Sequence, residues 1–298
     1  MEVKHKVFVQ VDQSGAEALI VAYLCRAGKF RDLFLNGIKP HVFTALNLFV
    51  EAWSSMPDKV DNSTLVKCLV AEPKDLKNVP GWKELDKVIK DSDNWEPAKR
   101  YYYMAKMVRH ARNYGMKART FKINLLQKSD GAVSMPESEC AKMLAQDEKV
   151  FPEIGEWQMD IVATVKKTSM LRNLFGHPRL FTGPKDESEW KRWFAFVPQS
   201  TVGQITNYAF VECQEEILAG KHPSDIDILE NNHDSILAQC LPENAEYTAR
   251  LLSSKLNRTL VSPRGEHFTM RSEMQFGFNW YKMVNEKVWA RYARAKGY

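Results

Sequence analysis

The feature that most constrains the fold is a short apolar run near the N-terminus that ends on an acidic residue. Residues 7–11 read Val-Phe-Val-Gln-Val, a composition typical of a strand buried within a sheet. Asp12 follows directly, and residues 16–24 have the composition of a buried helix. A sheet holds a carboxylate at a strand's end rigidly, as a metal site requires. The pattern therefore predicts a strand, a turn and a helix, with Asp12 presented at the end of the strand.

The turn after Asp12 has two interpretations. Ser14 and Glu17 fit the capping box Ser-x-x-Glu, in which each side chain bonds the backbone amide of the other residue. The alternative is that the turn carries functional side chains. Because capping boxes are common, the choice between the two depends on the rest of the chain.

Length and composition favour a globular protein with a real hydrophobic core. Of the 298 residues, 44% are hydrophobic and 27% are charged, which excludes a disordered or fibrous chain. One core begins to divide at this length, so we expect one compact protein with subdomains. No stretch approaches the roughly 20 apolar residues of a membrane span, and no apolar signal core follows the first residues. We therefore expect a cytoplasmic or nucleoid-associated protein that binds no membrane.

The cysteines and the net charge exclude some kinds of site. Five cysteines are scattered along the chain and none forms a Cys-x-x-Cys pair. Neither a disulfide framework nor a zinc site is predicted, and we expect reduced, mostly buried thiols. The formal net charge of +5 is modest, but it is spread unevenly.

Cationic side chains gather in residues 97–122, which contain eight Lys or Arg and no acid. Tyr102, Lys106, His110 and Tyr114 recur at every fourth position, so in a helix they share one side. A basic helix with interleaved aromatic rings suits a ligand that carries phosphate and a flat base. The alternative is a solvated basic face without a ligand.

The remaining sequence alternates between helical and strand-like patterns. The polar, proline-containing residues 51–93 predict short helices and loops. Amphipathic patterns predict helices at residues 137–150, 152–167, 186–196, 201–218 and 245–256, with a loop at 197–200. Apolar and β-branched residues predict a hairpin at 169–181 and strands at 225–229, 235–240 and 267–280.

A second carboxylate, Asp234, stands at the tight connection 231–234 between two predicted strands. A His-Asp dipeptide by itself is more often a polar turn. Asp12 and Asp234 are both carried by strands, however, and the basic aromatic segment 97–122 lies between them in the chain. This combination suggests a two-metal site for phosphoryl transfer.

The order of these motifs resembles the polymerase domain of the family A DNA polymerases, the DNA polymerase I class, in a phage-like variant. The resemblance covers nearly the whole chain. Residues 12–17, Asp-Gln-Ser-Gly-Ala-Glu, are similar to the family's Asp-Tyr-Ser-Gln-Ile-Glu, and residues 41–45, His-Val-Phe-Thr-Ala, to its His-Thr-x-Thr-Ala. Lys106 with Tyr114 and Gly115 resembles the helix of the fingers.

Three later segments follow in the family's order. Residues 174–179, Leu-Phe-Gly-His-Pro-Arg, are similar to the hairpin Leu-x-Gly-Arg-Arg-Arg. Residues 198–200, Pro-Gln-Ser, are similar to the loop Pro-x-Gln-Gly, and residues 233–235, His-Asp-Ser, to the motif His-Asp-Glu.

The resemblance implies template-directed DNA synthesis from deoxynucleoside triphosphates on a primer-template. It implies that Asp12 and Asp234 coordinate two Mg²⁺ ions, with the backbone carbonyl of Gln13 as a further ligand. One ion would lower the pKa of the primer's 3′-hydroxyl, and the other would hold the triphosphate and the leaving pyrophosphate. Mg²⁺ suits such a site because it takes few carboxylates and completes its shell with phosphate oxygens and water.

The resemblance also implies roles around the nucleotide. Lys106 matches the lysine that meets the incoming phosphates and donates a proton to the leaving group. His110 and Tyr114 match rings that stack on the nucleotide or the template base, and His41 matches a nucleotide-binding position. Glu17 matches the residue that crowds the 2′ position of the sugar and rejects ribonucleotides. The resemblance also implies contacts with DNA for Arg100, Arg109, Arg179, Gln199 and His233.

The chain departs from the family pattern at several positions. Tyr102 stands where the family has a phosphate-binding Arg, so we expect that role to pass to Arg100 or Arg109. His110 replaces a Phe or Tyr, and Ser235 replaces a Glu that helps near the metals. None of these changes removes a predicted metal ligand.

The implied fold is α/β (α+β), a palm with an antiparallel catalytic sheet and a mainly helical fingers subdomain. We expect the palm in residues 1–40 and 181–298 and the fingers in residues 41–180. The family's thumb and exonuclease domains would be absent from these residues. We expect them on a separate chain or outside this sequence.

Two alternatives to a DNA polymerase remain. The first is a non-catalytic DNA-binding relic or an accessory subunit of a replication complex, against which Asp12, Lys106 and Asp234 argue. The second is an RNA-making relative, against which Glu17 is the discriminating residue.

Overall fold

The computed structural model describes residues 5–297, which form two compact units. The sheet unit comprises the described residues of Met1–Ile20, Arg172–Pro178 and Val197–Tyr298. The helical unit comprises Val21–Leu171 and Arg179–Phe196. Three elements contain the points where the chain passes from one unit to the other: α1 (Ala16–Leu24), the hairpin of β2 (Met170–Arg172) and β3 (Pro178–Leu180), and α12 (Trp190–Leu218).

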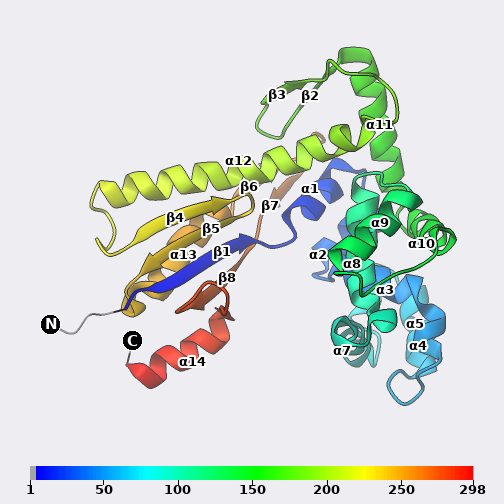
Figure 1. Ribbon diagram of the computed structural model, residues 1–298, viewed down its shortest axis with the longest axis horizontal. Coiled ribbons are helices and arrows are strands. Elements are labelled where there is room, and N and C mark those ends of the chain that lie inside the picture. The colour runs from blue at the N-terminus through cyan, green and yellow to red at the C-terminus, as the bar shows by residue number, and fades with distance from the viewer. Residues whose placement is uncertain (1–4, 298) are drawn as a thin grey trace. The chain divides into compact units, whose positions relative to one another are not determined.

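The sheet unit is built on five strands in the order β4–β5–β1–β8–β9 (Figure 1). Their bounds are β1 Val7–Gln13, β4 Asp227–Asn232, β5 Ser235–Cys240, β8 Ser272–Gly277 and β9 Val284–Asn285. Every pair of neighbouring strands is antiparallel. The antiparallel sheet and the mixture of helix and strand confirm the predicted fold class at this level.

Alternate residues of β1 face opposite sides of the sheet. Val7, Val9 and Val11 are 0% exposed, and the even-numbered residues between them, with Asp12, are only partly buried. The helix α13 (Ala245–Leu256) packs against β1, β5 and β8. Burial of the valine side chains fixes the register of the strand, because a slip by one residue would expose all of them. Asp12 is therefore fixed on the more open face.

The sheet unit also contains a hairpin of β6 (Thr259–Val261) and β7 (His267–Thr269), the short η3 (Pro242–Asn244) and a final helix, α14 (Glu286–Lys296). The predicted strand at 267–280 is divided between β7 and β8, and α14 and β6 were not predicted. The predicted helices at 16–24, 137–150 and 245–256 are confirmed with the same bounds.

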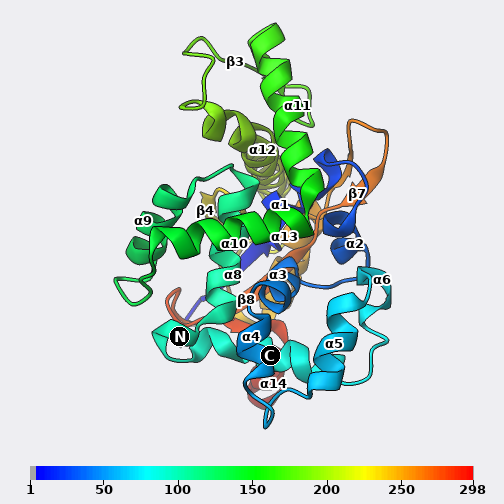
Figure 2. The same cartoon turned by 90° about the vertical axis from the view of Figure 1, so that its right-hand side faces the viewer.

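The helical unit holds ten helices that begin and end within it, together with two short 3₁₀ turns. They are α2 Lys29–Leu35, α3 Pro40–Leu48, α4 Val50–Ser54, α5 Asn62–Val70, α6 Pro73–Leu76, α7 Trp82–Asp91, η1 Ser92–Asn94, η2 Pro97–Lys99, α8 Tyr101–Asn113, α9 Ala118–Lys128, α10 Glu137–Val150 and α11 Pro152–Thr168. Figure 2 shows α10 running across α8, which it contacts together with α9 and α3. Apolar side chains of α8, α9 and α10, including Phe121 and Leu125, form one buried cluster.

The basic segment 97–122 is not one helix, because α8 ends at Asn113 and α9 begins at Ala118. Gly115 has a φ of +62°, and the amide of Met116 donates to the carbonyl of Ala111 (2.9 Å) while that of Gly115 donates to Arg112 (3.3 Å). This is a Schellman C-cap, in which a left-handed glycine ends the helix. The four-residue spacing of Tyr102, Lys106 and His110 on α8 therefore continues to Tyr114, which lies just past the end of that helix.

The predicted loop at 197–200 is wrong, because α12 continues through Pro198 as helix. The hydroxyl of Thr201 donates to the carbonyl of Val197 (2.7 Å) in this turn. Val202 and Ile205, one turn further, are 0% exposed. A proline in a helix lacks an amide donor, so packing of the buried face outweighs the local signal that predicted a break.

Two bulk predictions can be compared with the structure. All five cysteines are free and buried, as predicted. In the described part of the chain, no helix combines the length and apolar character that a bilayer crossing needs.

Candidate active site

The strand pairing of the sheet unit brings acidic side chains together around Asp12. In the sheet, Asp12 lies opposite Ser235 of β5 and opposite Glu273 of β8. Residues directly opposite in an antiparallel pair share one face of the sheet. Asp234 immediately precedes β5, and its carbonyl accepts a hydrogen bond from the amide of Gln13 (2.8 Å). The two predicted carboxylates are therefore held beside each other at adjoining strand ends.

A side chain of α12 holds the turn that carries Asp234. His233 has a φ of +56°, a left-handed conformation that is uncommon for a residue with a side chain. The hydroxyl of Thr206 donates to the carbonyl of His233 (2.7 Å) and accepts from the side-chain amide of Gln13 (2.7 Å). Gln13 is 1% exposed, so its side chain ties β1 to α12. Its predicted role as a ligand concerns only the backbone carbonyl.

The electrostatics of the carboxylates favour a cation. Burial, together with the negative charges of Asp234 and Glu273, raises the pKa of Asp12 from 3.8 to about 6, and burial is the largest cause. Like charges held this close repel one another unless a cation neutralises them. Carboxylate oxygens are the hard ligands that Mg²⁺ prefers, so Asp12 and Asp234 fit the implied metal. Among residues 5–297, no group of three or more His, Cys, Asp or Glu side chains is arranged to hold a metal ion.

Glu273 is a third carboxylate at this site that no sequence motif predicted. The hydroxyl of Ser14 donates to its Oε1 (2.8 Å), which holds the carboxylate on the strand beside Asp12. The stretch containing Glu273 was predicted as a strand, but no local signal shows which strand it pairs with. The same hydrogen bond gives Ser14 a tertiary partner that a capping box does not predict.

Glu17 and His233 also lie together in the sheet unit. Glu17 Oε1 is 3.4 Å from His233 Nε2, a contact on partly exposed side chains. Gln199 is partly buried in α12. The structure thus brings Asp12 and Gln13 close to Asp234 and Glu17 close to His233, and their roles stay predictions.

Hydrogen bonds to Asn173 fix the turn between β2 and β3, next to the predicted DNA contact Arg179. Asn173 Oδ1 accepts from the amides of Phe175 and His177 (both 3.0 Å), and Asn173 Nδ2 donates to Gln204 (2.9 Å). Arg179, in the helical unit, is exposed, and its guanidinium carbon lies 5.4 Å from the ring centre of Phe181.

The helical unit gathers a second group of predicted residues around Lys106. Lys106 Nζ is 2.8 Å from Asp93 Oδ2 and 4.4 Å from the ring centre of Tyr102. His41 meets the same ring edge-on at 6.1 Å. Burial lowers the pKa of His41 to about 3, with smaller contributions in the same direction from the charges of Arg109 and Lys106, so this histidine is neutral at pH 7.

The other predicted ring residues of this unit differ in exposure. His110 is partly buried and meets the ring of Tyr114 edge-on at 5.0 Å. Tyr114 is 2% exposed and Tyr102 is 7% exposed, so both belong to the packing of the unit. Arg100 is partly buried, and its Nε donates to the carbonyl of Asp93 (2.8 Å).

Arg109 occupies a different environment from the one predicted for a DNA contact. Its side chain is 1% exposed and pairs with the equally buried Asp147 (2.7 Å). Its guanidinium also lies over the rings of Phe30 and Phe151, at 5.0 and 4.6 Å.

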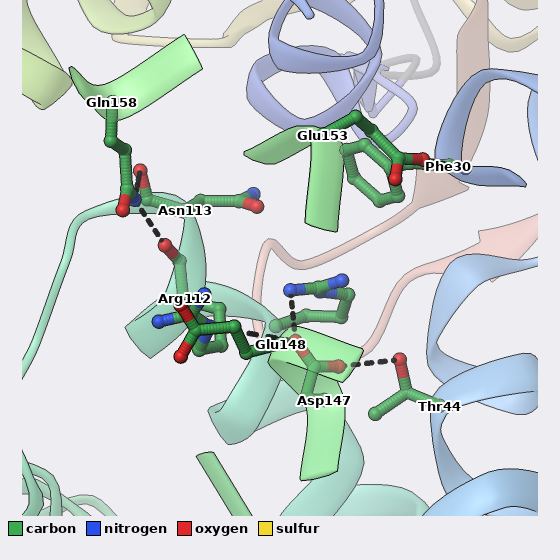
Figure 3. A network of polar contacts seen from close by, with 9 residues as sticks. Phe30, Thr44, Arg112, Asn113, Asp147, Glu148, Glu153 and Gln158 are labelled. Atoms are coloured by element: carbon green, nitrogen blue, oxygen red, sulfur yellow. Dashed lines mark hydrogen bonds and ion pairs between the residues drawn. The ribbon is translucent and has the colours of Figure 1, made fainter. Parts of the chain in front are cut away.

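The network around Asp147 crosses three helices. Figure 3 shows Thr44 and Arg112 on either side of Asp147. The network therefore ties α8 to α10 and α3. We assign Arg109 to the core of the helical unit instead of to a DNA surface.

Comparison with known proteins identifies the fold. No protein-family model matches the chain, and no curated protein matches its sequence. Among solved structures, the chain is similar to the POL domain of Pol1 from M. smegmatis in complex with DNA primer-template and dNTP, with a TM-score of 0.62 and 15% identity. The match covers 94% of this chain and 41% of that chain. The chain thus has the fold of a family A polymerase domain, and the comparison does not distinguish a phage-like variant.

Proposed function

We propose that this chain catalyses template-directed DNA synthesis, transferring a nucleotidyl group from a deoxynucleoside triphosphate to the 3′-hydroxyl of a primer. The observation that carries the proposal is the placement of Asp12 beside Asp234 at adjoining strand ends, in a chain with the polymerase fold. The similar structure contains DNA primer-template and dNTP, which supports both as ligands of this chain.

We infer that the sheet unit is the palm and the helical unit the fingers. The predicted boundaries lie after residues 40 and 180. The compact units divide between residues 20 and 21 and again between residues 196 and 197, and the short segment Arg172–Pro178 also belongs to the sheet unit. The fingers would then begin within α1 and end within α12. The helices α1 and α12 run without a break through the two boundaries. This is compatible with the assignment, because a single helix can extend from one compact unit into another.

The proposed reaction makes one bond and breaks one. The oxygen of the 3′-hydroxyl bonds to the α-phosphorus, the bond from that phosphorus to pyrophosphate breaks, and the proton of the hydroxyl passes to solvent water. Mg²⁺, as two ions, lowers the pKa of the hydroxyl and neutralises phosphate charge when bound. In this proposal, Asp12 and Asp234 hold the ions together with the backbone carbonyl of Gln13.

Other residues would bind and select the substrates. The ammonium group of Lys106 faces the negative charge that develops on the leaving pyrophosphate and supplies a proton to it. His41 and Tyr102 lie beside Lys106, which supports a position near the phosphates. Glu17 would exclude the 2′-hydroxyl of a ribonucleotide. Residues proposed to face the base or the DNA are His110, Arg100, Arg179, Gln199 and His233, whereas the buried Tyr114 supports His110 from within the unit.

Primer extension with the purified chain, Mg²⁺ and all four deoxynucleoside triphosphates tests this function. We expect Asp12→Asn and Asp234→Asn each to abolish extension and to leave duplex affinity nearly unchanged, because the carboxylates serve chemistry whereas cationic side chains bind the phosphate backbone. Glu230→Gln, on the exposed edge strand β4, is the control and should extend primers normally.

Two outcomes would contradict the proposal in different ways. Retained synthesis in either aspartate variant would remove the two-metal assignment. A wild-type chain that binds primer-template but never extends it would favour the non-catalytic DNA-binding alternative.

A further inference from the structure

Lys106 has an ionic partner that the proposed reaction does not use. Its Nζ lies 2.8 Å from Oδ2 of Asp93, and the two side chains are 40% and 28% exposed. Asp93 belongs to η1, the short turn between α7 and the basic helix α8. The carboxylate of Asp93 therefore pairs with the same ammonium group that the proposed function assigns to the triphosphate.

The turn places Asp93 firmly. The hydroxyl of Ser92 donates to the carbonyl of Ile89 (2.6 Å) and accepts from the amide of Tyr102 (3.0 Å). Arg100 Nε donates to the carbonyl of Asp93 (2.8 Å). These bonds join the end of α7 to the start of α8 on both sides of the carboxylate. The contact with Lys106 is therefore a consequence of a well-determined backbone.

The surroundings of the ion pair are incompletely bonded. Among the described residues, Oδ1 of Asp93 and Nδ1 of His41 are both buried atoms without a hydrogen-bond partner. The Lys106 ammonium lies over the ring of Tyr102, and its charge, like that of Arg109, acts on His41. A buried polar atom without a hydrogen-bond partner costs free energy. A ligand that supplies hydrogen-bond partners to these atoms would therefore gain affinity.

We propose that Asp93 is an internal competitor for Lys106, holding its ammonium until a polyphosphate displaces the carboxylate. This inference rests on the proposed function, because it assumes that Lys106 binds the triphosphate. A partly exposed ion pair is weak, whereas a triphosphate carries several negative charges that act together on one cation. Displacement is therefore favourable, yet every polyphosphate, including the released pyrophosphate, binds less tightly than it would to an unpaired lysine. Asp93 is a positioning residue that sets the affinity of the site and eases product release.

Calorimetric binding of inorganic tripolyphosphate and of dATP to the purified chain tests the proposal. We expect Asp93→Asn to bind both about fourfold more tightly than the wild type, which corresponds to about 0.8 kcal/mol at 1.4 kcal/mol for each tenfold change. Asp93→Glu retains the charge and should restore an affinity close to that of the wild type. A purely structural role for Asp93 would not produce a gain in affinity.

A matched control lies on the neighbouring helix. Asp86 of α7 pairs with Lys90 at 2.5 Å, with side-chain exposures of 25% and 40%, so its exposure and charge resemble those of the Asp93–Lys106 pair. Asp86→Asn should leave tripolyphosphate affinity unchanged. In a Lys106→Ala background, Asp93→Asn should also have no effect, because the competition requires both partners.

The outcomes separate this inference from the proposed function. Equal or weaker tripolyphosphate binding by Asp93→Asn, with circular dichroism and thermal unfolding like those of the wild type, would overturn the inference while primer extension still supported the function. If Asp93→Asn misfolds, Asp93→Ser provides the same loss of charge in a shorter side chain, and the same comparison applies. A wild-type chain that neither extends primers nor binds tripolyphosphate through Lys106 would overturn both.

Discussion

At the scale of single residues, the ionisation of Asp12 gives a prediction that is independent of activity. Its pKa is raised from 3.8 to about 6 in the folded protein, so the metal-free fold loses stability as pH rises between these values and carries the whole loss above pH 6. Asp12→Asn should therefore be more stable than the wild type at pH 7, by on the order of 1 kcal/mol once partial exposure is allowed for.

Thermal unfolding of both proteins across pH, with and without Mg²⁺, measures this effect. The advantage of Asp12→Asn should vanish below about pH 3, where Asp12 is protonated in both folded and unfolded chains. Mg²⁺ should stabilise the wild type at pH 7 and have much less effect on the variant, because ligands that bind only the folded state raise its stability. A wild type that does not respond to Mg²⁺ would argue against a metal at Asp12.

A substitution of Glu17 distinguishes a role in capping α1 from a role in sugar selection. It stands in the first turn of α1 and also faces His233. If it guards the sugar, Glu17→Ala should incorporate ribonucleotides at close to the wild-type rate for deoxynucleotides. If it serves only the helix start, its loss should instead lower stability by about 1 kcal/mol and leave sugar selection unchanged. Both properties are measured on the same variant.

At the scale of elements, the buried pair of Arg109 and Asp147 joins α8 to α10. Arg109→Ala would leave a carboxylate buried without its main partner, and we expect a loss of about 3–5 kcal/mol in the free energy of unfolding. Lys142→Ala, which removes the exposed partner of Glu139 on α10, should change stability by less than about 1 kcal/mol. Urea unfolding of the three proteins gives the values. A small loss for Arg109→Ala, accompanied by weaker DNA binding, would restore its predicted role at the DNA.

At the scale of the whole molecule, the positive net charge comes from the helical unit, and much of it from residues 97–122. Arg119 and Lys122 of α9 are exposed. If they meet the DNA backbone, replacing both with Gln should weaken primer-template binding. It should also reduce the slope of log affinity against log salt by about 0.9 for each lost phosphate contact.

Fluorescence anisotropy across a range of salt concentrations measures that slope. Lys67→Gln, an exposed cation of α5 outside the basic segment, is the control and should leave the slope unchanged. An unaltered slope in the double variant would place the DNA contacts elsewhere on the chain.

The sequence by itself determined most of the elements and the position of the two strand-borne aspartates. The helices α1, α10 and α13 agree with their predicted bounds because apolar composition, for α1, and amphipathic periodicity, for the other two, are local properties of the chain. Asp12 and Asp234 could be placed at strand ends for the same reason. One local signal failed where packing opposed it, at Pro198 inside α12.

The tertiary structure decided which side chains share an environment. Glu273 stands beside Asp12 only because β8 pairs with β1, and strand pairing between distant segments leaves no local trace in the sequence. Arg109 and Lys106 belong to one basic helix, yet one is sealed against Asp147 and the other is held at a partly exposed site by Asp93. Charge can be read from the residue type, but burial and the identity of the counter-ion depend on contacts across the fold, and these determine whether a cation stabilises the core or binds a ligand.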